Sequence, residues 1–142
     1  MVNLEKIMSR DVVTVNQNAE IYDVLRMMVD GNITGLPVLD DDGKLVGIVT
    51  EKDVMSRMLT THNTQGKAAD YMTAEVISFN VNDNLLDVIS ALAKNNFRRV
   101  PIVSGEKLVG IISRSDIISY LFSLELKDRG KIVTAVKGKI FV

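Results

Sequence analysis

The stretch KLVGIVTEKD at residues 44–53 recurs as KLVGIISRSD at residues 107–116, and this recurrence decides how the chain is organised. The similarity continues towards the N-terminus, where Met8 matches Met72 and Pro37 matches Pro101, each 64 positions apart. The offset falls to 63 after the hairpin loops, because the second loop is one residue shorter. A difference confined to a loop is what duplication of a folded unit leaves, since loops tolerate changes in length.

The first half of each copy is predicted to be a strand followed by a helix. A short run rich in β-branched residues opens each copy, at residues 12–15 and 76–79. Apolar residues then recur at i, i+3, i+4 and i+7, starting from Ile21 and from Leu85, which is the spacing of one helix face. Residues suited to cap these helices precede them, namely Asn18, Asn82 and Asp83.

The second half of each copy is predicted to be a β-hairpin followed by another helix. The loops carry Gly with Asp or Ser, which is typical of hairpin turns. The helices are expected to begin near Thr50 and near Ser113. The strands are expected at residues 36–39, 44–50, 100–103 and 107–113. The order β-α-β-β-α is therefore predicted twice.

This order places the chain in the α/β (α+β) class, with two related units. A unit of about 50 residues is marginal alone, and a three-stranded sheet with helices on one face leaves its other face bare. Packing each sheet against its duplicate buries both bare faces in a pseudo-two-fold pair. We assign residues 1–64 to the first domain and residues 65–126 to the second. Residues 127–142 form a basic tail, which could fold as a hairpin around Gly138.

The composition excludes several classes of function. The net charge of −1 argues against a protein that coats nucleic acid, although the basic tail leaves RNA binding as an alternative. With no Cys and one His, the chain has no thiolate chemistry and no histidine metal cluster. No apolar run approaches the ~20 residues that span a bilayer, and the N-terminus lacks a signal-peptide pattern. We therefore expect a cytoplasmic protein that does not enter a membrane.

A hydroxyl residue and an aspartate recur where the last strand of each copy meets its second helix. Thr50 precedes Asp53 by three positions, and Ser113 precedes Asp116 by the same spacing. One interpretation is a capping box, in which both side chains bind free N–H groups of the first helical turn. A binding site is favoured by the doubling of the pattern and by the glycine before each copy of it. A helix N-terminus suits a phosphate, and a carboxylate suits a ribose diol.

The order of these motifs resembles a pair of cystathionine-β-synthase-type (CBS) domains. The first copy carries Val-x-Thr-Val, Gly-Leu-Pro-Val and Leu-Val-Gly-Ile-Val-Thr-x-x-Asp, and the second carries Val-Ile-Ser-Phe, Arg-Val-Pro-Ile and Leu-Val-Gly-Ile-Ile-Ser-x-x-Asp. The resemblance covers about residues 4–122. It implies a stand-alone CBS pair that binds AMP, ADP, ATP or S-adenosylmethionine in two clefts between the copies. Such a protein acts as a regulatory sensor.

The resemblance also implies roles for particular residues. In the family the Thr or Ser contacts phosphate and the Asp contacts ribose. These roles carry over to Thr50, Ser113, Asp53 and Asp116. Residues of the first strand and residues before the strand proline usually line the base pocket, and here they are Thr14, Ser78, Gly35, Leu36, Arg99 and Val100.

The two copies differ in charge beside these motifs. Thr34 in the first copy corresponds to Arg98 in the second, and Lys52 corresponds to Ser115. In some relatives a basic residue at the Arg98 position reaches the phosphate, and a basic residue at the Lys52 position can point into the opposite cleft. The resemblance therefore implies that Lys52 and Arg98 could converge on the cleft of the second copy. The alternative is that both are ordinary solvated surface charges.

We expect neither catalysis nor a cofactor, because no nucleophile–base pair and no set of metal ligands is in view. A protein-interaction scaffold without a ligand is the main alternative to a sensor. The resemblance further implies a homodimer joined through helical faces. Apolar residues of the second helices would be covered in this dimer, namely Met55, Met58, Ile118, Leu121 and Phe122. The regulated partner is not identified by the sequence.

Overall fold

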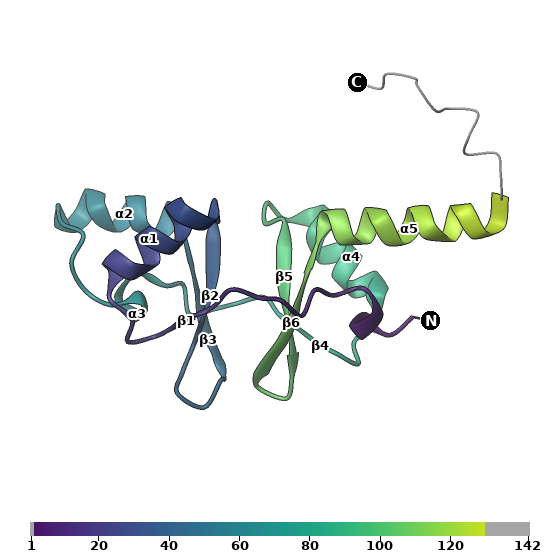
Figure 1. The fold of residues 1–142 in the computed structure, drawn as a ribbon, viewed down its shortest axis with the longest axis horizontal. Helices are drawn as coiled ribbons and strands as arrows, with labels where there is room; N and C mark the ends of the chain where they lie inside the picture. Colours follow the sequence, from purple (N-terminus) through teal and green to yellow (C-terminus); the bar gives the residue numbers. More distant parts are fainter. Residues whose placement is uncertain (1, 130–142) are drawn as a thin grey trace, which may run out of the picture.

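The computed structural model describes residues 2–129 of the 142-residue chain, so the hairpin expected around Gly138 lies outside the described residues. The predicted order β-α-β-β-α is confirmed twice, in two units that lie side by side (Figure 1). The first unit consists of β1 (Val15–Asn16), α1 (Ile21–Gly31), β2 (Gly35–Leu39), β3 (Leu45–Thr50) and α2 (Glu51–Thr61). The second consists of β4 (Phe79–Asn80), α4 (Leu85–Lys94), β5 (Arg99–Ser104), β6 (Lys107–Ser113) and α5 (Arg114–Arg129).

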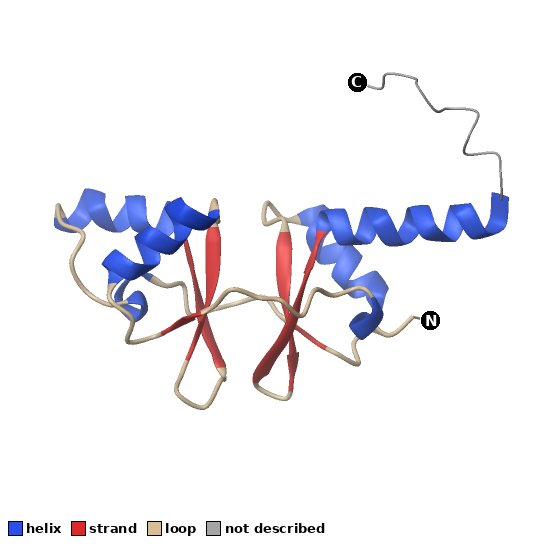
Figure 2. Ribbon diagram, viewed as in Figure 1, coloured by secondary structure: helices blue, strands red, loops and turns tan. Residues whose placement is uncertain are grey.

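Each unit contains a three-stranded sheet of the same topology. The strand orders are β1-β2-β3 and β4-β5-β6, and the central strand is parallel to the first strand and antiparallel to the third. In register, Gly35 pairs with Thr50 and Arg99 pairs with Ser113. The start of each central strand therefore lies beside the hydroxyl residue of the motif. The two sheets lie next to each other in the middle of the molecule, with the helices on their outer sides and towards the end opposite the hairpin loops (Figure 2).

The first strand of each unit is shorter than predicted. β1 and β4 have two residues each, and residues 12–14 and 76–78 are not strand. The β-branched residues in these segments favour an extended backbone, but a strand also requires a neighbouring strand with which it can pair. Ser9 pairs with Ile111 of the second sheet, whereas Val15 pairs with Val38 of the first. Residues 10–14 therefore cross between the sheets, and residues 74–78 make the equivalent crossing.

The predicted caps of the first helices are wrong. α1 begins after Glu20, which makes no side-chain cap, and α4 begins after Asn84, whose side chain accepts from the N–H of Leu86 at 2.9 Å. Asn18, Asn82 and Asp83 instead take part in the turns before the helices, through hydrogen bonds with Asn16 or Asn80. The predicted starts of the second helices are confirmed, since α2 follows Thr50 and α5 follows Ser113.

The leading segments of the two repeats are exchanged between the hydrophobic cores. The short helix η1 (Leu4–Lys6) precedes the first unit in sequence, yet Leu4 and Met8 are buried in the core of the second unit. Helix α3 (Ala68–Tyr71) precedes the second unit, yet Ala68 and Tyr71 are buried in the core of the first. Each core therefore depends on residues from both sequence repeats.

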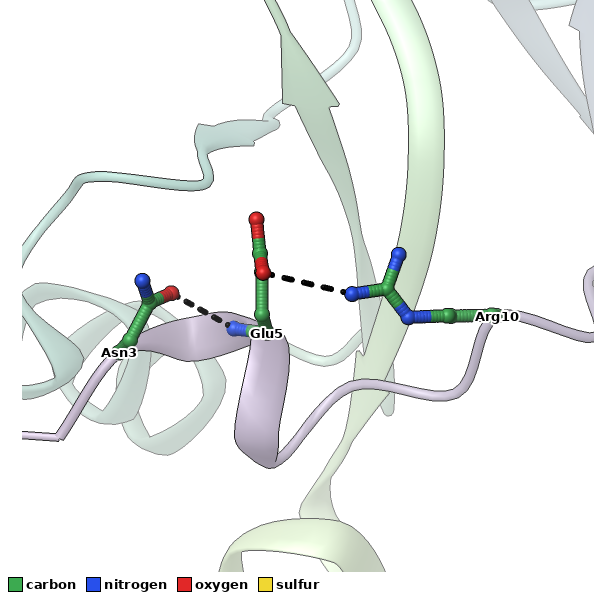
Figure 3. A network of polar contacts seen from close by, with 3 residues as sticks. All are labelled: Asn3, Glu5 and Arg10. Atoms are coloured by element: carbon green, nitrogen blue, oxygen red, sulfur yellow. Dashed lines mark hydrogen bonds and ion pairs between the residues drawn. The ribbon is translucent and has the colours of Figure 1, made fainter.

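Two polar contacts lie within the N-terminal segment (Figure 3). The Asn3 side chain accepts a hydrogen bond from the N–H of Glu5 at 2.9 Å and so caps η1. The Glu5 carboxylate lies 3.4 Å from the guanidinium of Arg10, at the start of the crossing segment. Both side chains of this ion pair are well exposed, so it contributes little stability.

Two glycines allow the exchanged segments to approach the sheets. A Cβ at Gly47 would lie 2.5 Å from the sulfur of Met72 and 3.0 Å from the carbonyl oxygen of Thr73. A Cβ at Gly110 would lie 2.5 Å from the sulfur of Met8. The sequence pattern favours a binding site beside these glycines, but the space there is occupied by the chain itself.

Candidate functional site

Thr50 and Asp53 form a capping box at the start of α2, so the capping interpretation is confirmed in the first copy. Oδ2 of Asp53 accepts hydrogen bonds from the N–H of Thr50 at 2.8 Å and from its hydroxyl at 2.9 Å. Oγ1 of Thr50 in turn accepts from the N–H of Asp53 at 3.2 Å. Both residues are half-buried. The box fixes the Asp53 carboxylate against the first turn of the helix.

Ser113 and Asp116 take the matching positions at the start of α5, with a different hydroxyl contact. Oδ2 of Asp116 accepts from the N–H of Ser113 at 2.8 Å, and Oγ of Ser113 accepts from the N–H of Asp116 at 3.1 Å. The Ser113 hydroxyl shares a 2.9 Å hydrogen bond with the hydroxyl of Ser115, not with the carboxylate. The second copy therefore keeps both hydrogen bonds between the motif side chains and backbone N–H groups. The Asp116 carboxylate, however, accepts fewer hydrogen bonds from the described residues than the Asp53 carboxylate does.

The residues before the strand prolines lie beside these motifs, but not all of their side chains face outward. Gly35 pairs with Thr50, and Arg99, which is exposed, pairs with Ser113. Leu36 and Val100 are 0% and 1% exposed and belong to the two hydrophobic cores. Any contact of these two residues with a ligand would therefore come from their backbone atoms.

Arg98 lies next to the start of α5, because its carbonyl oxygen accepts from the N–H of Arg114 at 2.8 Å. Thr34 makes the equivalent contact with Glu51 at the start of α2, at 3.0 Å. The Arg98 and Lys52 side chains are exposed, and within residues 2–129 neither has a polar partner. Arg98 is thus a free cation beside the motif of its own copy. The expected convergence of Lys52 on the same motif stays a prediction.

Ser78 lines a cleft of about 390 Å³ at the hairpin ends of the sheets, and Thr14 is half-buried on the other crossing segment. A 3.0 Å ion pair between Lys44 and Glu106 joins the two units at this cleft, and the hydrogen bond to Glu106, together with its charge, raises the pKa of Lys44. The cleft does not bring Ser78 together with the Ser/Thr–Asp motifs. Its lining residues are Asp40, Lys44, Leu45, Val46, Ala74, Val76, Ser78, Val103, Gly105 and Glu106.

Thr73 contacts the first motif, although the sequence interpretation missed it. Its hydroxyl donates to Oδ1 of Asp53 at 3.0 Å. Its backbone pairs with Ile48 of β3, just as Ser9 pairs with Ile111 of β6. The repeat alignment contains a signal for this contact, because Thr73 and Ser9 each follow the matched methionine. The sequence alone does not show that these two residues pair with the second strand of each hairpin, β3 and β6.

Within residues 2–129, no group of three or more His, Cys, Asp or Glu side chains is placed to hold a metal ion. Over the same range, no helix has the length and apolar character needed to cross a membrane.

The family model for the CBS domain matches the chain twice, at residues 4–60 and at residues 68–123. The chain belongs to the CBS domain family. Its two CBS repeats are similar to MJ1225 of Methanocaldococcus jannaschii, at 34% identity over 84% of this chain and 43% of that protein. They also match inosine-5′-monophosphate dehydrogenase of the same organism, at 31% identity over 80% of this chain and 22% of the enzyme. This chain spans less than half the length of the first curated relatives that it matches.

Solved CBS pairs have the same fold as this chain. CBSX2 of Arabidopsis thaliana, solved in complex with AMP, is 25% identical with a TM-score of 0.77, over 88% of this chain and 99% of that chain. The CBS pair of MJ0100, solved with 5′-methylthioadenosine and S-adenosyl-L-methionine, is 29% identical with a TM-score of 0.69, over 88% and 98%. Adenosine derivatives are therefore bound by relatives that share nearly the whole fold.

Proposed function

We propose that this CBS pair is a cytoplasmic regulatory module that binds an adenine nucleotide and controls a partner protein. The observation that carries the proposal is the pair of matched motifs, Thr50–Asp53 and Ser113–Asp116, at the starts of α2 and α5. Each combines a hydroxyl, a carboxylate and a helix N-terminus, which suit a phosphate and a ribose. The complex of CBSX2 with AMP supports the assignment of the ligand class.

The charge beside the second motif favours a phosphorylated ligand over S-adenosylmethionine. Arg98 is exposed next to the start of α5 and has no polar partner among the described residues. A guanidinium binds phosphate oxygens through two parallel hydrogen bonds. The sulfonium group of S-adenosylmethionine is a cation, which Arg98 would repel. AMP, ADP or ATP is therefore the better fit to this chain.

A thermal-shift panel tests the proposal directly. AMP, ADP, ATP, GMP and S-adenosylmethionine are each added to the full chain at millimolar concentration. A ligand at about 100 times its Kd stabilises the folded state by about 2.7 kcal/mol, which raises the melting temperature by a few degrees. We expect such a rise with at least one adenine nucleotide and none with GMP. No rise with any adenine compound, together with no calorimetric signal, would contradict the proposal.

A scaffold without a ligand is the second candidate, favoured by the apolar residues exposed on α2 and α5. Met55, Ile118 and Phe122 are 62%, 65% and 51% exposed. Surfaces of this kind mark protein interfaces. A stable protein partner that is captured equally with and without adenine nucleotides, alongside a negative thermal-shift panel, would favour the scaffold.

A further inference from the structure

The Asp53 carboxylate is more fully occupied than the Asp116 carboxylate. A carboxylate offers about four lone-pair positions for hydrogen bonds. Asp53 accepts two bonds at Oδ2 from Thr50 and one at Oδ1 from the Thr73 hydroxyl. Asp116 accepts one bond from the described residues, at Oδ2 from the N–H of Ser113. A ribose diol donates two hydrogen bonds, so Asp116 has room for both, whereas Asp53 has room for about one.

One cause of the difference is the residue that follows the matched methionine. The backbones of Thr73 and Ser9 occupy equivalent places, since Thr73 pairs with Ile48 at 2.8 and 3.0 Å and Ser9 pairs with Ile111 at 2.9 Å in both directions. Thr is β-branched and more restricted at χ1 than Ser, and the Thr73 hydroxyl points to Oδ1 of Asp53. Within the described part of the chain, the Ser9 side chain makes no hydrogen bond. The equivalent oxygen of Asp116 is therefore left open.

The second cause is the residue before each motif aspartate. In the second unit, the Ser115 hydroxyl engages the Ser113 hydroxyl at 2.9 Å. In the first unit this position is Lys52, which offers no hydroxyl, and the Thr50 hydroxyl turns to Asp53 instead. Both differences act in the same direction, because each one fills a lone pair of Asp53.

We propose that Thr73 is a specificity-determining residue that competes with ribose for Asp53, so that the chain has one strong nucleoside site at Asp116 and one weak site at Asp53. This inference rests on the proposed nucleotide-binding function. It differs from the charge argument for Arg98, because the competition is for ribose and not for phosphate. Adenosine, which has no phosphate, must therefore show the same inequality between the sites.

Titration calorimetry with adenosine tests this competition in two backgrounds that isolate the sites. Asp116→Ala leaves the Asp53 site, and Asp53→Ala leaves the Asp116 site. Thr73→Val removes the hydroxyl at nearly constant shape, and we expect it to strengthen adenosine binding about threefold to tenfold in the Asp116→Ala background. Ser9→Thr adds the competing side chain, and we expect it to weaken adenosine binding in the Asp53→Ala background. Thr73→Ala should agree with Thr73→Val, and Thr64→Val in the exposed linker is the matched control.

The outcomes separate the two proposals. If adenosine and AMP bind but Thr73→Val and Thr73→Ala leave the Asp53 site unchanged or weaker, the competition is wrong and the proposed function stands. If neither compound binds to the wild type or to any variant, the proposed function fails and the inference fails with it. The melting temperature of each unliganded variant shows whether the fold is retained.

Discussion

At the scale of single residues, the same helix-capping motif occurs in both units with different neighbouring residues. The Ser/Thr–Asp motif caps a helix in both units, so these residues have a structural role besides the proposed contact with a ligand. What distinguishes the copies is what surrounds the cap: Thr73 against Ser9 and Thr34 against Arg98. A ligand that carries both a ribose and a phosphate would be sensitive to both differences.

The first prediction concerns Arg98. Arg98→Ala should weaken AMP binding roughly tenfold, because a hydrogen-bonded cation beside the phosphate is lost. Adenosine binding should change little, since adenosine has no phosphate. Titration calorimetry of both ligands checks the prediction, with Lys94→Ala on α4 as a control for lost surface charge. An equal loss for adenosine and AMP would mean that Arg98 does not contact the phosphate.

At the scale of elements, local patterns predicted the hairpins and the starts of the second helices, because these features are set by residues close together in sequence. The exchange of η1 and α3 between the cores was not predicted. These segments have three and four residues, too few to show a helical period, and their burial depends on packing against a distant repeat. The same reason explains why the Thr73 contact with Asp53 and the burial of Leu36 were not anticipated.

The second prediction tests this exchange. Leu4→Ala should lower the free energy of unfolding by about 2–5 kcal/mol, because it leaves a cavity in the core of the second unit. Val13→Ala, at a 48% exposed position on the crossing segment, should change it by about 0.5 kcal/mol or less. Urea denaturation measures both. If Leu4→Ala matched Val13→Ala, the N-terminal segment would not belong to the second core.

At the scale of the whole molecule, the two units form one pseudo-symmetric pair whose helices α2 and α5 expose apolar side chains. The sequence predicts five apolar residues on the surface of these helices, and the structure confirms that all five are exposed: Met55, Met58, Ile118, Leu121 and Phe122. The homodimer that would cover them remains a prediction. Large contiguous apolar patches, as distinct from scattered apolar residues, mark protein interfaces.

The third prediction is that the chain is a dimer at tens of micromolar. Ile118→Glu should convert it to a monomer, because a charge would be buried in the interface without a partner. Val29→Glu, at an 80% exposed position on α1, should leave the dimer intact. Light scattering distinguishes these states, and a monomeric wild type at that concentration would exclude the proposed dimer.

The central claim is that this CBS pair binds an adenine nucleotide at two unequal sites, and calorimetric titration of AMP into the two aspartate variants tests it most directly. Asp116→Ala should remove the tighter binding event, because it takes away the carboxylate with the most free acceptor positions, beside Arg98. Asp53→Ala should leave that event largely intact, because the Asp53 carboxylate already accepts three hydrogen bonds from the chain. Equal losses in the two variants, or no AMP binding by the wild type, would contradict the account.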